Sequence, residues 1–213
     1  MKKVLAVLGL IAVAVAGLAV IAFTSMGESY DKVFEASEES GNIPEKTIGD
    51  PSKAKLVIYE YADYGCSHCA EWNATMTRLV NEYGGDLAVV FRHFDLGYQN
   101  GHTVALAATA AQLQGYWEEF KSIVFAYQED WFYAPEDEIE NILVSYFMEI
   151  SNGLGDAEKF VSDMKSEAVE KRIQFENKIG NKVGVKGTPT FRMGGKEANL
   201  NTLEDKIAEK LKK

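Results

Sequence analysis

The chain opens with a continuous apolar stretch before any amphipathic pattern begins. Val4–Phe23 is an unbroken apolar run, and as a helix it is about 30 Å long, which matches the hydrocarbon core of a bilayer. A usual cleavable signal peptide has a shorter apolar stretch of roughly 7–15 residues. The pattern therefore predicts an uncleaved transmembrane anchor at residues 1–23, and a cleaved signal peptide is the alternative.

Charges around the apolar run predict its orientation. Lys2 and Lys3 precede it, and an acidic segment follows it. The positive-inside rule then places the N-terminus in the cytoplasm and the remaining chain outside, as a single-pass protein of the cell membrane. Residues 24–46 are polar, acidic and weakly periodic, which predicts a linker with a short helix near Tyr30–Ala36.

The next segments alternate between strand and helix patterns. Lys55–Tyr61 is rich in β-branched and aromatic residues, which is typical of a buried strand. Apolar residues then recur at helical spacing from Trp72 to Tyr83, and Leu87–Phe94 is a second buried strand. The order strand, helix, strand predicts a parallel βαβ unit.

Residues 101–184 carry helix signals only. Within them, Asp156 is placed to cap a helix that we expect to run toward Gly180. The composition then predicts a hairpin of Thr190–Met193 and Lys196–Ala198, followed by a final amphipathic helix.

Composition and charge narrow the function. The 213 residues include 32 acidic and 22 basic ones, for a net charge of −10, and the chain lacks a basic stripe. We therefore expect no nucleic-acid partner. The chain has two cysteines, Cys66 and Cys69, which excludes a disulfide-stapled scaffold and a structural zinc site built from two cysteine pairs.

The two cysteines form a Cys-Ser-His-Cys motif between the first strand and its helix. The first turn of a helix stabilises a thiolate at Cys66, and an imidazolium at His68 would add to this effect. A disulfide of such a thiolate with Cys69 is a strong oxidant. A purely stabilising disulfide is disfavoured, because so short a loop contributes only about 2 kcal/mol. Metal binding by the motif remains the alternative.

A second motif, Gly187-Thr188-Pro189-Thr190-Phe191, precedes the late hairpin. Proline at the start of an edge strand is compatible with the sheet. Alternatively, the Thr188-Pro189 bond of this motif is cis and lies beside the cysteines. It would then leave one edge of the backbone free to pair with a peptide.

These motifs, with the string Phe91-Arg92-His93-Phe94 and the long helical stretch, resemble the DsbA-like branch of the thioredoxin superfamily over residues 47–213. The resemblance implies an α/β thioredoxin-like fold with a helical insertion at about 101–184. It also implies that Cys66 is the exposed nucleophile, that Cys69 is the buried partner, and that a cis Thr188-Pro189 contacts substrate. Ser67 departs from the Cys-Pro-His-Cys form of the family, so the redox potential is left open.

Glu60 lies six residues before Cys66 and shares a strand face with Leu56 and Ile58. The resemblance makes it the counterpart of a buried acid that relays protons to the second cysteine. The alternative is an acid that reaches solvent at the sheet edge.

The expected function is that of an extracytoplasmic oxidase that donates the Cys66–Cys69 disulfide to reduced exported proteins. The family implies reoxidation by a quinone-linked membrane protein of DsbB or vitamin K epoxide reductase type. We expect no resident metal and no organic cofactor besides the cysteine pair. A reductase or isomerase, and a metal-binding or metal-delivery module, are the alternatives. His93 and His102 are interpreted as structural or solvent-facing residues.

Overall fold

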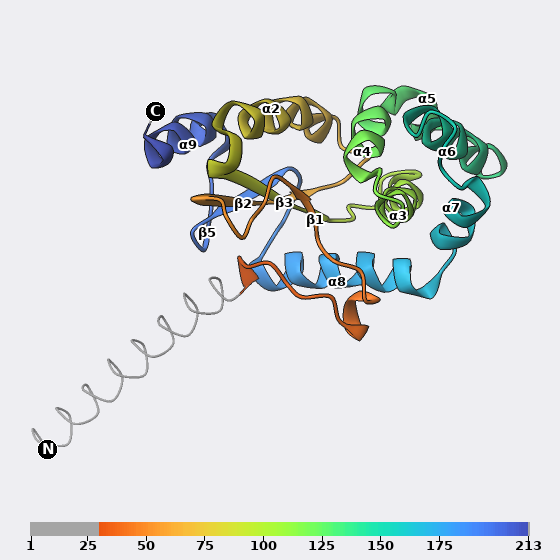
Figure 1. Ribbon diagram of the computed structural model, residues 1–213, viewed down its shortest axis with the longest axis horizontal. Helices are drawn as coiled ribbons and strands as arrows, with labels where there is room; N and C mark the ends of the chain where they lie inside the picture. Colours follow the sequence, from red (N-terminus) through yellow and green to blue (C-terminus); the bar gives the residue numbers. More distant parts are fainter. Residues whose placement is uncertain (1–29, 213) are drawn as a thin grey trace, which may run out of the picture.

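The computed structural model describes residues 30–212 (Figure 1). The expected anchor at 1–23 and the first part of the linker therefore lie outside the described residues. None of the helices between residues 30 and 212 is long and apolar enough to cross a bilayer.

A mixed five-stranded sheet of order β1-β3-β2-β4-β5 forms the centre of the fold. Its strands are β1 (Lys46–Ile48), β2 (Leu56–Ala62), β3 (Leu87–His93), β4 (Thr190–Met193) and β5 (Lys196–Glu197). The β2–β3 pair is parallel and the other pairs are antiparallel. The structure thus contains the predicted parallel unit and the predicted hairpin, whereas β1 is too short to show a pattern in the sequence.

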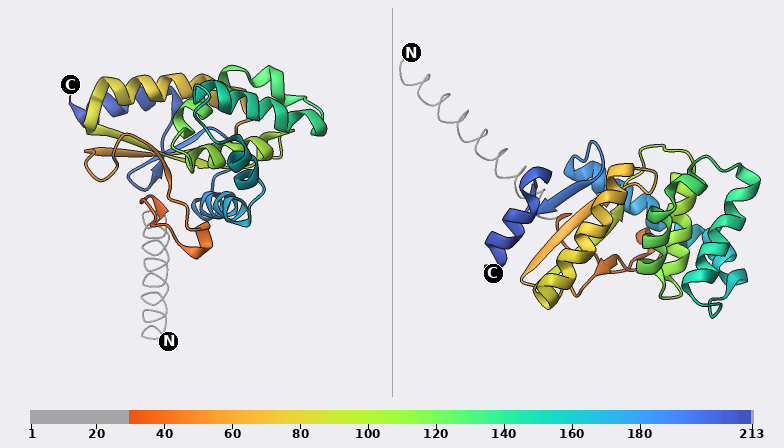
Figure 2. Two further views of the ribbon diagram at one scale, coloured as in Figure 1. Left: turned by 45° about the vertical axis from the view of Figure 1, so that its right-hand side comes forward. Right: turned by 90° about the horizontal axis from the view of Figure 1, so that it is seen from above.

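Helices cover both faces of this sheet and build a separate layer beyond its end. They are α2 (Ser67–Tyr83), α3 (Gly101–Gln112), α4 (Trp117–Ala126), α5 (Gln128–Phe132), α6 (Glu136–Ile150), α7 (Ala157–Met164), α8 (Glu167–Val183) and α9 (Leu203–Leu211). Helices α2 and α9 lie on one face and α8 on the other, while α3 to α7 gather to one side (Figures 1 and 2). The chain is therefore an α/β fold with helices inserted between β3 and β4.

Burial follows from this layering. Every residue of β3 is buried, because helices pack on both of its faces. In α2 the buried positions recur at helical spacing, from Cys69 through Met76, Leu79 and Val80 to Tyr83. This apolar stripe fixes the helix on the sheet and, with it, the position of the cysteine motif.

The segment before β1 differs from the expected linker. The buried guanidinium of Arg92 donates hydrogen bonds to the carbonyl oxygens of Tyr30 and Lys32, at 3.0 and 2.7 Å, and pairs with Glu45 at 2.6 Å. Residues 31–37 are not helical, and the helix expected near Tyr30–Ala36 is wrong. A buried charge requires partners, and these backbone carbonyls hold residues 30–45 against the domain.

The helix expected from Asp156 toward Gly180 is two helices. Asp156 caps α7 as predicted, with its side chain accepting from the Lys159 N–H at 2.9 Å. A second cap interrupts the run, because the Ser166 hydroxyl accepts from the N–H of Val169 at 3.3 Å and starts α8.

Candidate functional site

The cysteine motif lies where β2 passes into α2. Cys66 is the N-cap of α2 with an extended backbone (φ −86°, ψ 118°), and Cys69 lies in the first turn of that helix. Both are free cysteines, with relative exposures of 4% for Cys66 and 0% for Cys69. Cys66 therefore lies at the positive end of the helix dipole. The expectation of an exposed Cys66 is wrong, because both thiols are buried, and Cys69 is only the more deeply buried of the two.

The two thiols have opposite proton affinities. A hydrogen bond from the Cys69 thiol, together with the backbone N–H groups of Cys69 and His68, lowers the pKa of Cys66 to about 5. Burial, and the position of Cys66 beside it, raise the pKa of Cys69 far above its ordinary value. The pair can thus hold one thiolate and one thiol at neutral pH, with the charge on Cys66.

His68 contributes differently from the sequence-based expectation. Its side chain is exposed, and its backbone N–H is the group that favours the Cys66 thiolate. The side-chain role that the motif suggests remains a proposal.

The second motif packs against the first, although 122 residues separate them. The Thr188-Pro189 peptide bond is cis, and the Cys66 thiol donates a weak hydrogen bond to the Thr188 carbonyl oxygen at 3.4 Å. Strand β4, which begins directly after Pro189, is an inner strand and not the expected edge strand. A shallow hollow of about 470 Å³ lies beside Pro189 and is lined by Thr190, residues 197–201 and the proline itself.

Glu60 is buried in β2, opposite Phe191 of β4, with a relative exposure of 1%. The alternative of an acid that reaches solvent is therefore wrong. Burial raises the pKa of Glu60 to about 7, and the charge of Lys121 opposes this effect. The Oε2 atom of Glu60 has no hydrogen-bond partner among the described residues, so this carboxyl can gain or lose a proton without breaking a bond at that atom.

Lys121 was missed by the sequence analysis. It lies in α4 with a relative exposure of 1%, and its ammonium group is 5.1 Å from the ring centre of Trp117 and 5.8 Å from that of Phe91. Burial lowers its pKa, whereas the charge of Glu60 raises it. A lysine between acidic and aromatic residues gives no sequence signal of burial.

Exposed apolar side chains lie next to the cysteine loop. A side chain on Gly65 would collide with Tyr98, and the Tyr98 ring lies 6.1 Å from that of Phe132. Leu96 and Tyr98 are 40% exposed, and Tyr133 beside Phe132 is 76% exposed. An apolar surface of this kind suits a polypeptide partner.

The residues around the two sulfurs do not form a metal site of three side-chain ligands. In the part of the chain from 30 to 212, the one group of three close ligating side chains is Asp63, His93 and Asp95, without either cysteine. Burial lowers the pKa of His93 to about 4 and raises that of Asp63 to about 6. The sequence pattern predicts a structural or solvent-facing role for His93 and gives no signal for Asp63.

Comparison with known proteins places this site in a family. The family model described as Thioredoxin matches residues 42–213. The chain belongs to the thioredoxin family. The parallel strand–Cys-X-X-Cys–helix unit and the cis-proline loop facing it belong to the matched region.

Curated relatives of this family member fall into two groups. The Na(+)/H(+) antiporter NhaA of Herminiimonas arsenicoxydans is 33% identical over 149 residues, which are 70% of this chain and 22% of that protein. The chain thus spans about a fifth of the antiporter's length. The "Probable disulfide bond formation protein D" of Bacillus anthracis is 25% identical over 191 residues, covering 86% of each chain.

Solved structures show the same fold. Oxidised BdbD from Bacillus subtilis superimposes with a TM-score of 0.67 at 16% identity, covering 85% of this chain and 98% of that one. The thioredoxin-like fold with inserted helices is therefore confirmed. The printed name of the Bacillus anthracis relative gives that protein a role in disulfide bond formation.

The thiolate assignment predicts a titration. In the reduced full-length protein, thiolate absorbance should rise with a midpoint near pH 5, because hydrogen bonds favour the Cys66 anion. Cys66→Ser should abolish this transition. Cys69→Ala should keep it but move it upward, since the hydrogen bond from the Cys69 thiol is the strongest stabilising interaction and alanine cannot donate one. A Cys66 midpoint near that of free cysteine, about 8.5, would contradict the assignment.

Burial of Glu60 predicts a dependence of stability on pH. Its folded pKa of about 7 lies above the ordinary 4.5, so ionisation costs folded-state free energy, by about 3 kcal/mol in all. Below the Glu60 pKa of the unfolded chain, 4.5, this loss of stability is absent. Above the Glu60 pKa of the folded protein, about 7, it reaches its full size. As pH rises from about 4 to about 8, urea unfolding should show wild type losing stability relative to Glu60→Gln. The exposed Glu71→Gln is the matched control and should follow wild type.

Proposed function

We propose that this protein is an extracytoplasmic oxidase that donates a Cys66–Cys69 disulfide to reduced exported proteins. The observation that carries the proposal is the opposite shift of the two thiol pKa values, downward for Cys66 and upward for Cys69. A low Cys66 pKa stabilises the reduced enzyme, which makes its disulfide a stronger oxidant.

The proposed exchange has two steps. A substrate thiolate attacks Cys66 Sγ, the Cys66–Cys69 bond breaks, and Cys69 leaves as a thiolate that takes up a proton because its pKa is high. A second substrate thiolate then attacks the substrate sulfur of the mixed disulfide. Cys66 leaves as a stable thiolate, the substrate gains a disulfide, and the enzyme holds the two electrons.

Glu60 is proposed to supply the proton that Cys69 takes up. A carboxyl with a pKa of about 7 is populated in both protonation states at neutral pH, which suits a proton donor and acceptor. This role is proposed to act without contact to the substrate sulfur, from the buried side of the sheet. His68 is proposed to add to the stability of the Cys66 thiolate through its side chain when it is protonated.

The cis Thr188-Pro189 loop is proposed to bind substrate. The Thr188 carbonyl oxygen lies 3.4 Å from the reacting sulfur, so a substrate segment bound there could pair with the backbone of this loop. The exposed Leu96, Tyr98 and Tyr133 lie next to the cysteine loop and would contact apolar side chains of an unfolded substrate.

Turnover requires an oxidant for the reduced pair. We propose a quinone-linked membrane protein of DsbB or vitamin K epoxide reductase type, which accepts the two electrons by disulfide exchange with Cys66. We also propose that residues 1–23 anchor the chain in the cell membrane, with the N-terminus cytoplasmic and the catalytic domain extracytoplasmic, near such a partner.

The proposed roles of the two sulfurs predict trapped intermediates. Cys69→Ala should accumulate mixed disulfides, which form when its Cys66 thiolate attacks a disulfide of an exported protein and displaces one of that protein's thiolates, because no internal thiol is left to resolve them. Cys66→Ala should trap none, since it lacks the leaving-group thiolate. Non-reducing gels of cells treated with acid to stop exchange measure the adducts, which should disappear on reduction. Trapping by Cys66→Ala alone would reverse the roles, and a lack of adducts in both variants would refute the oxidase.

The proposed anchor predicts a membrane protein of full mass. The chain should remain in the membrane fraction after an alkaline carbonate wash, at its uncleaved 23.6 kDa. The double variant Leu10→Arg and Val15→Arg should lose this association, because each central arginine costs about 3 kcal/mol of insertion. A soluble form that begins near residues 17–23 would show that the segment is a cleaved signal peptide.

A further inference from the structure

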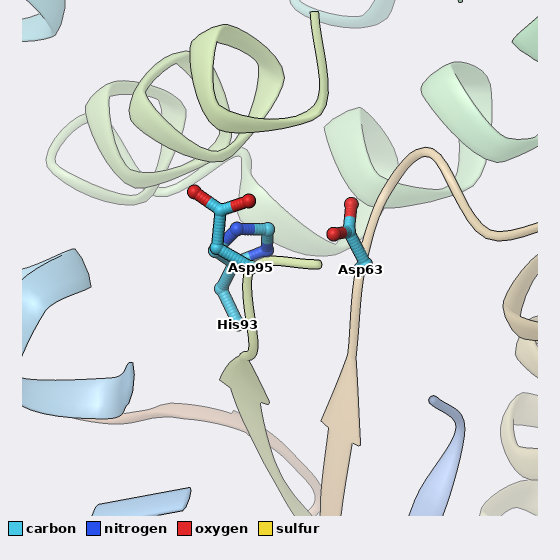
Figure 3. Close-up of side chains that lie close together, drawn as sticks. All are labelled: Asp63, His93 and Asp95. Carbon is cyan, nitrogen blue, oxygen red and sulfur yellow. The ribbon is translucent and has the colours of Figure 1, made fainter. Parts of the chain in front are cut away.

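A compact group of ligating side chains lies at one edge of the sheet, beside the cysteine loop. Asp63 follows the last residue of β2, His93 ends β3, and Asp95 lies two residues further on. Because β2 and β3 are parallel, their carboxyl ends meet at the same edge (Figure 3). One ligand atom from each of the three side chains lies within 4.8 Å of the other two.

His93 is the decisive member of this group. It has a relative exposure of 0%, and neither of its ring nitrogens has a hydrogen-bond partner among residues 30–212. An imidazole buried without partners for its two nitrogens is costly. The charges of Glu176 and Asp95 act on this imidazole, and in Figure 3 its ring lies beside Asp95, with Asp63 at the end of the neighbouring strand.

Neighbouring groups hold each of these side chains in place. The two oxygens of Asp63 accept from the N–H groups of Gly65 and Leu96, at 2.9 and 2.7 Å. The His93 ring stacks on Tyr64 at 5.8 Å between centres, with 16° between the planes. Each Asp63 oxygen keeps a free lone pair after accepting one bond.

Asp95 is held in the same way. One of its oxygens accepts from the N–H of Gly97 at 2.8 Å, and the other lies 3.1 Å from Nδ1 of His102. The second nitrogen of His102 lies 3.1 Å from a carboxylate oxygen of Glu170. Outer partners of this kind orient the ligands of metal ions.

We propose that Asp63, His93 and Asp95 bind a divalent metal ion, and that Zn²⁺ suits them best. One imidazole and two carboxylates are a ligand set that zinc accepts, with an open fourth position for water. Tetrahedral ligands about 2.1 Å from zinc are about 3.4 Å apart, so the three atoms need approach one another by no more than about 1.4 Å. This proposal revises the expectation of a chain without a metal, and it is independent of the oxidase proposal.

The ion would tie together two strand ends and the start of the cysteine loop. Asp63 accepts the Cys66 N–H through its backbone oxygen at 3.1 Å, so its position bears on that of the nucleophile. A bound ion would therefore link the carboxyl end of β3 to the loop that carries Cys66.

Titration of the oxidised full-length protein in detergent with Zn²⁺ tests the proposal. The Cys66–Cys69 disulfide removes both thiolates as competing ligands. Calorimetry should show one zinc ion per chain, and zinc should raise the melting temperature. His93→Gln and Asp95→Asn should each weaken binding by about 100-fold or more, since loss of even an outer partner costs about 10–100-fold. The matched controls His68→Gln and Asp205→Asn should bind as wild type.

Cobalt provides a readout that does not depend on any variant. Co²⁺ added to the oxidised wild type should give visible d–d bands without thiolate charge-transfer bands, and Zn²⁺ should displace it. Absence of binding to the oxidised protein would overturn the proposal, as would unchanged zinc affinity in a folded His93→Gln protein. Binding by the reduced protein alone would also overturn it and assign the metal to the cysteines.

Discussion

The parallel pairing of β2 with β3, in register from Leu56 with Leu87 to Ala62 with His93, determines where the chemistry of this protein lies. Both strands end at the same edge of the sheet, so the loop after β2 delivers Cys66 to the start of α2 there. Strand β4 pairs with β2 from the other side, and its preceding residues bring Pro189 to the same edge. The cysteine loop and the cis-proline loop therefore meet, because β2 and β3 end at the edge of the sheet where β4 begins.

A buried ionic network lies at this same carboxyl end of β3, where Arg92 precedes His93 and the His93 N–H donates to Glu176 at 2.7 Å. The side chains of Glu45, Lys46, Arg92, Arg172 and Glu176 are all fully buried and joined by ion pairs of 2.6 to 3.3 Å. They connect the segment before β1, β1 itself, β3 and α8. Removal of one partner from such a group typically costs about 3–5 kcal/mol, because it leaves a buried charge unpaired. The network therefore fixes how the chain before the sheet and the long helix below it pack.

Local patterns in the sequence were sufficient for the elements near the site. The β-branched and aromatic run Lys55–Tyr61, the helical spacing after Cys66 and the composition of the hairpin after Pro189 each act within a few residues, so these elements were predictable. The partners of Arg92 and the burial of Lys121 depend on chain segments that are distant in sequence. The local pattern of polar and apolar residues therefore cannot predict them. The position of His93 beside Asp63 is likewise not predictable from local sequence, because the two residues are 30 positions apart and meet only when β2 pairs with β3.

The placement of Lys121 gives the inserted helices an electrostatic role in the core. Its ammonium group belongs to α4, whereas the carboxyl that it influences, Glu60, belongs to the central strand of the thioredoxin part. The proton affinity of an acid under the active site is thus set partly by a different structural layer. A greater distance between Lys121 and Glu60 would therefore make Glu60 retain its proton more strongly, so the packing of α4 on the sheet sets how readily this buried acid ionises.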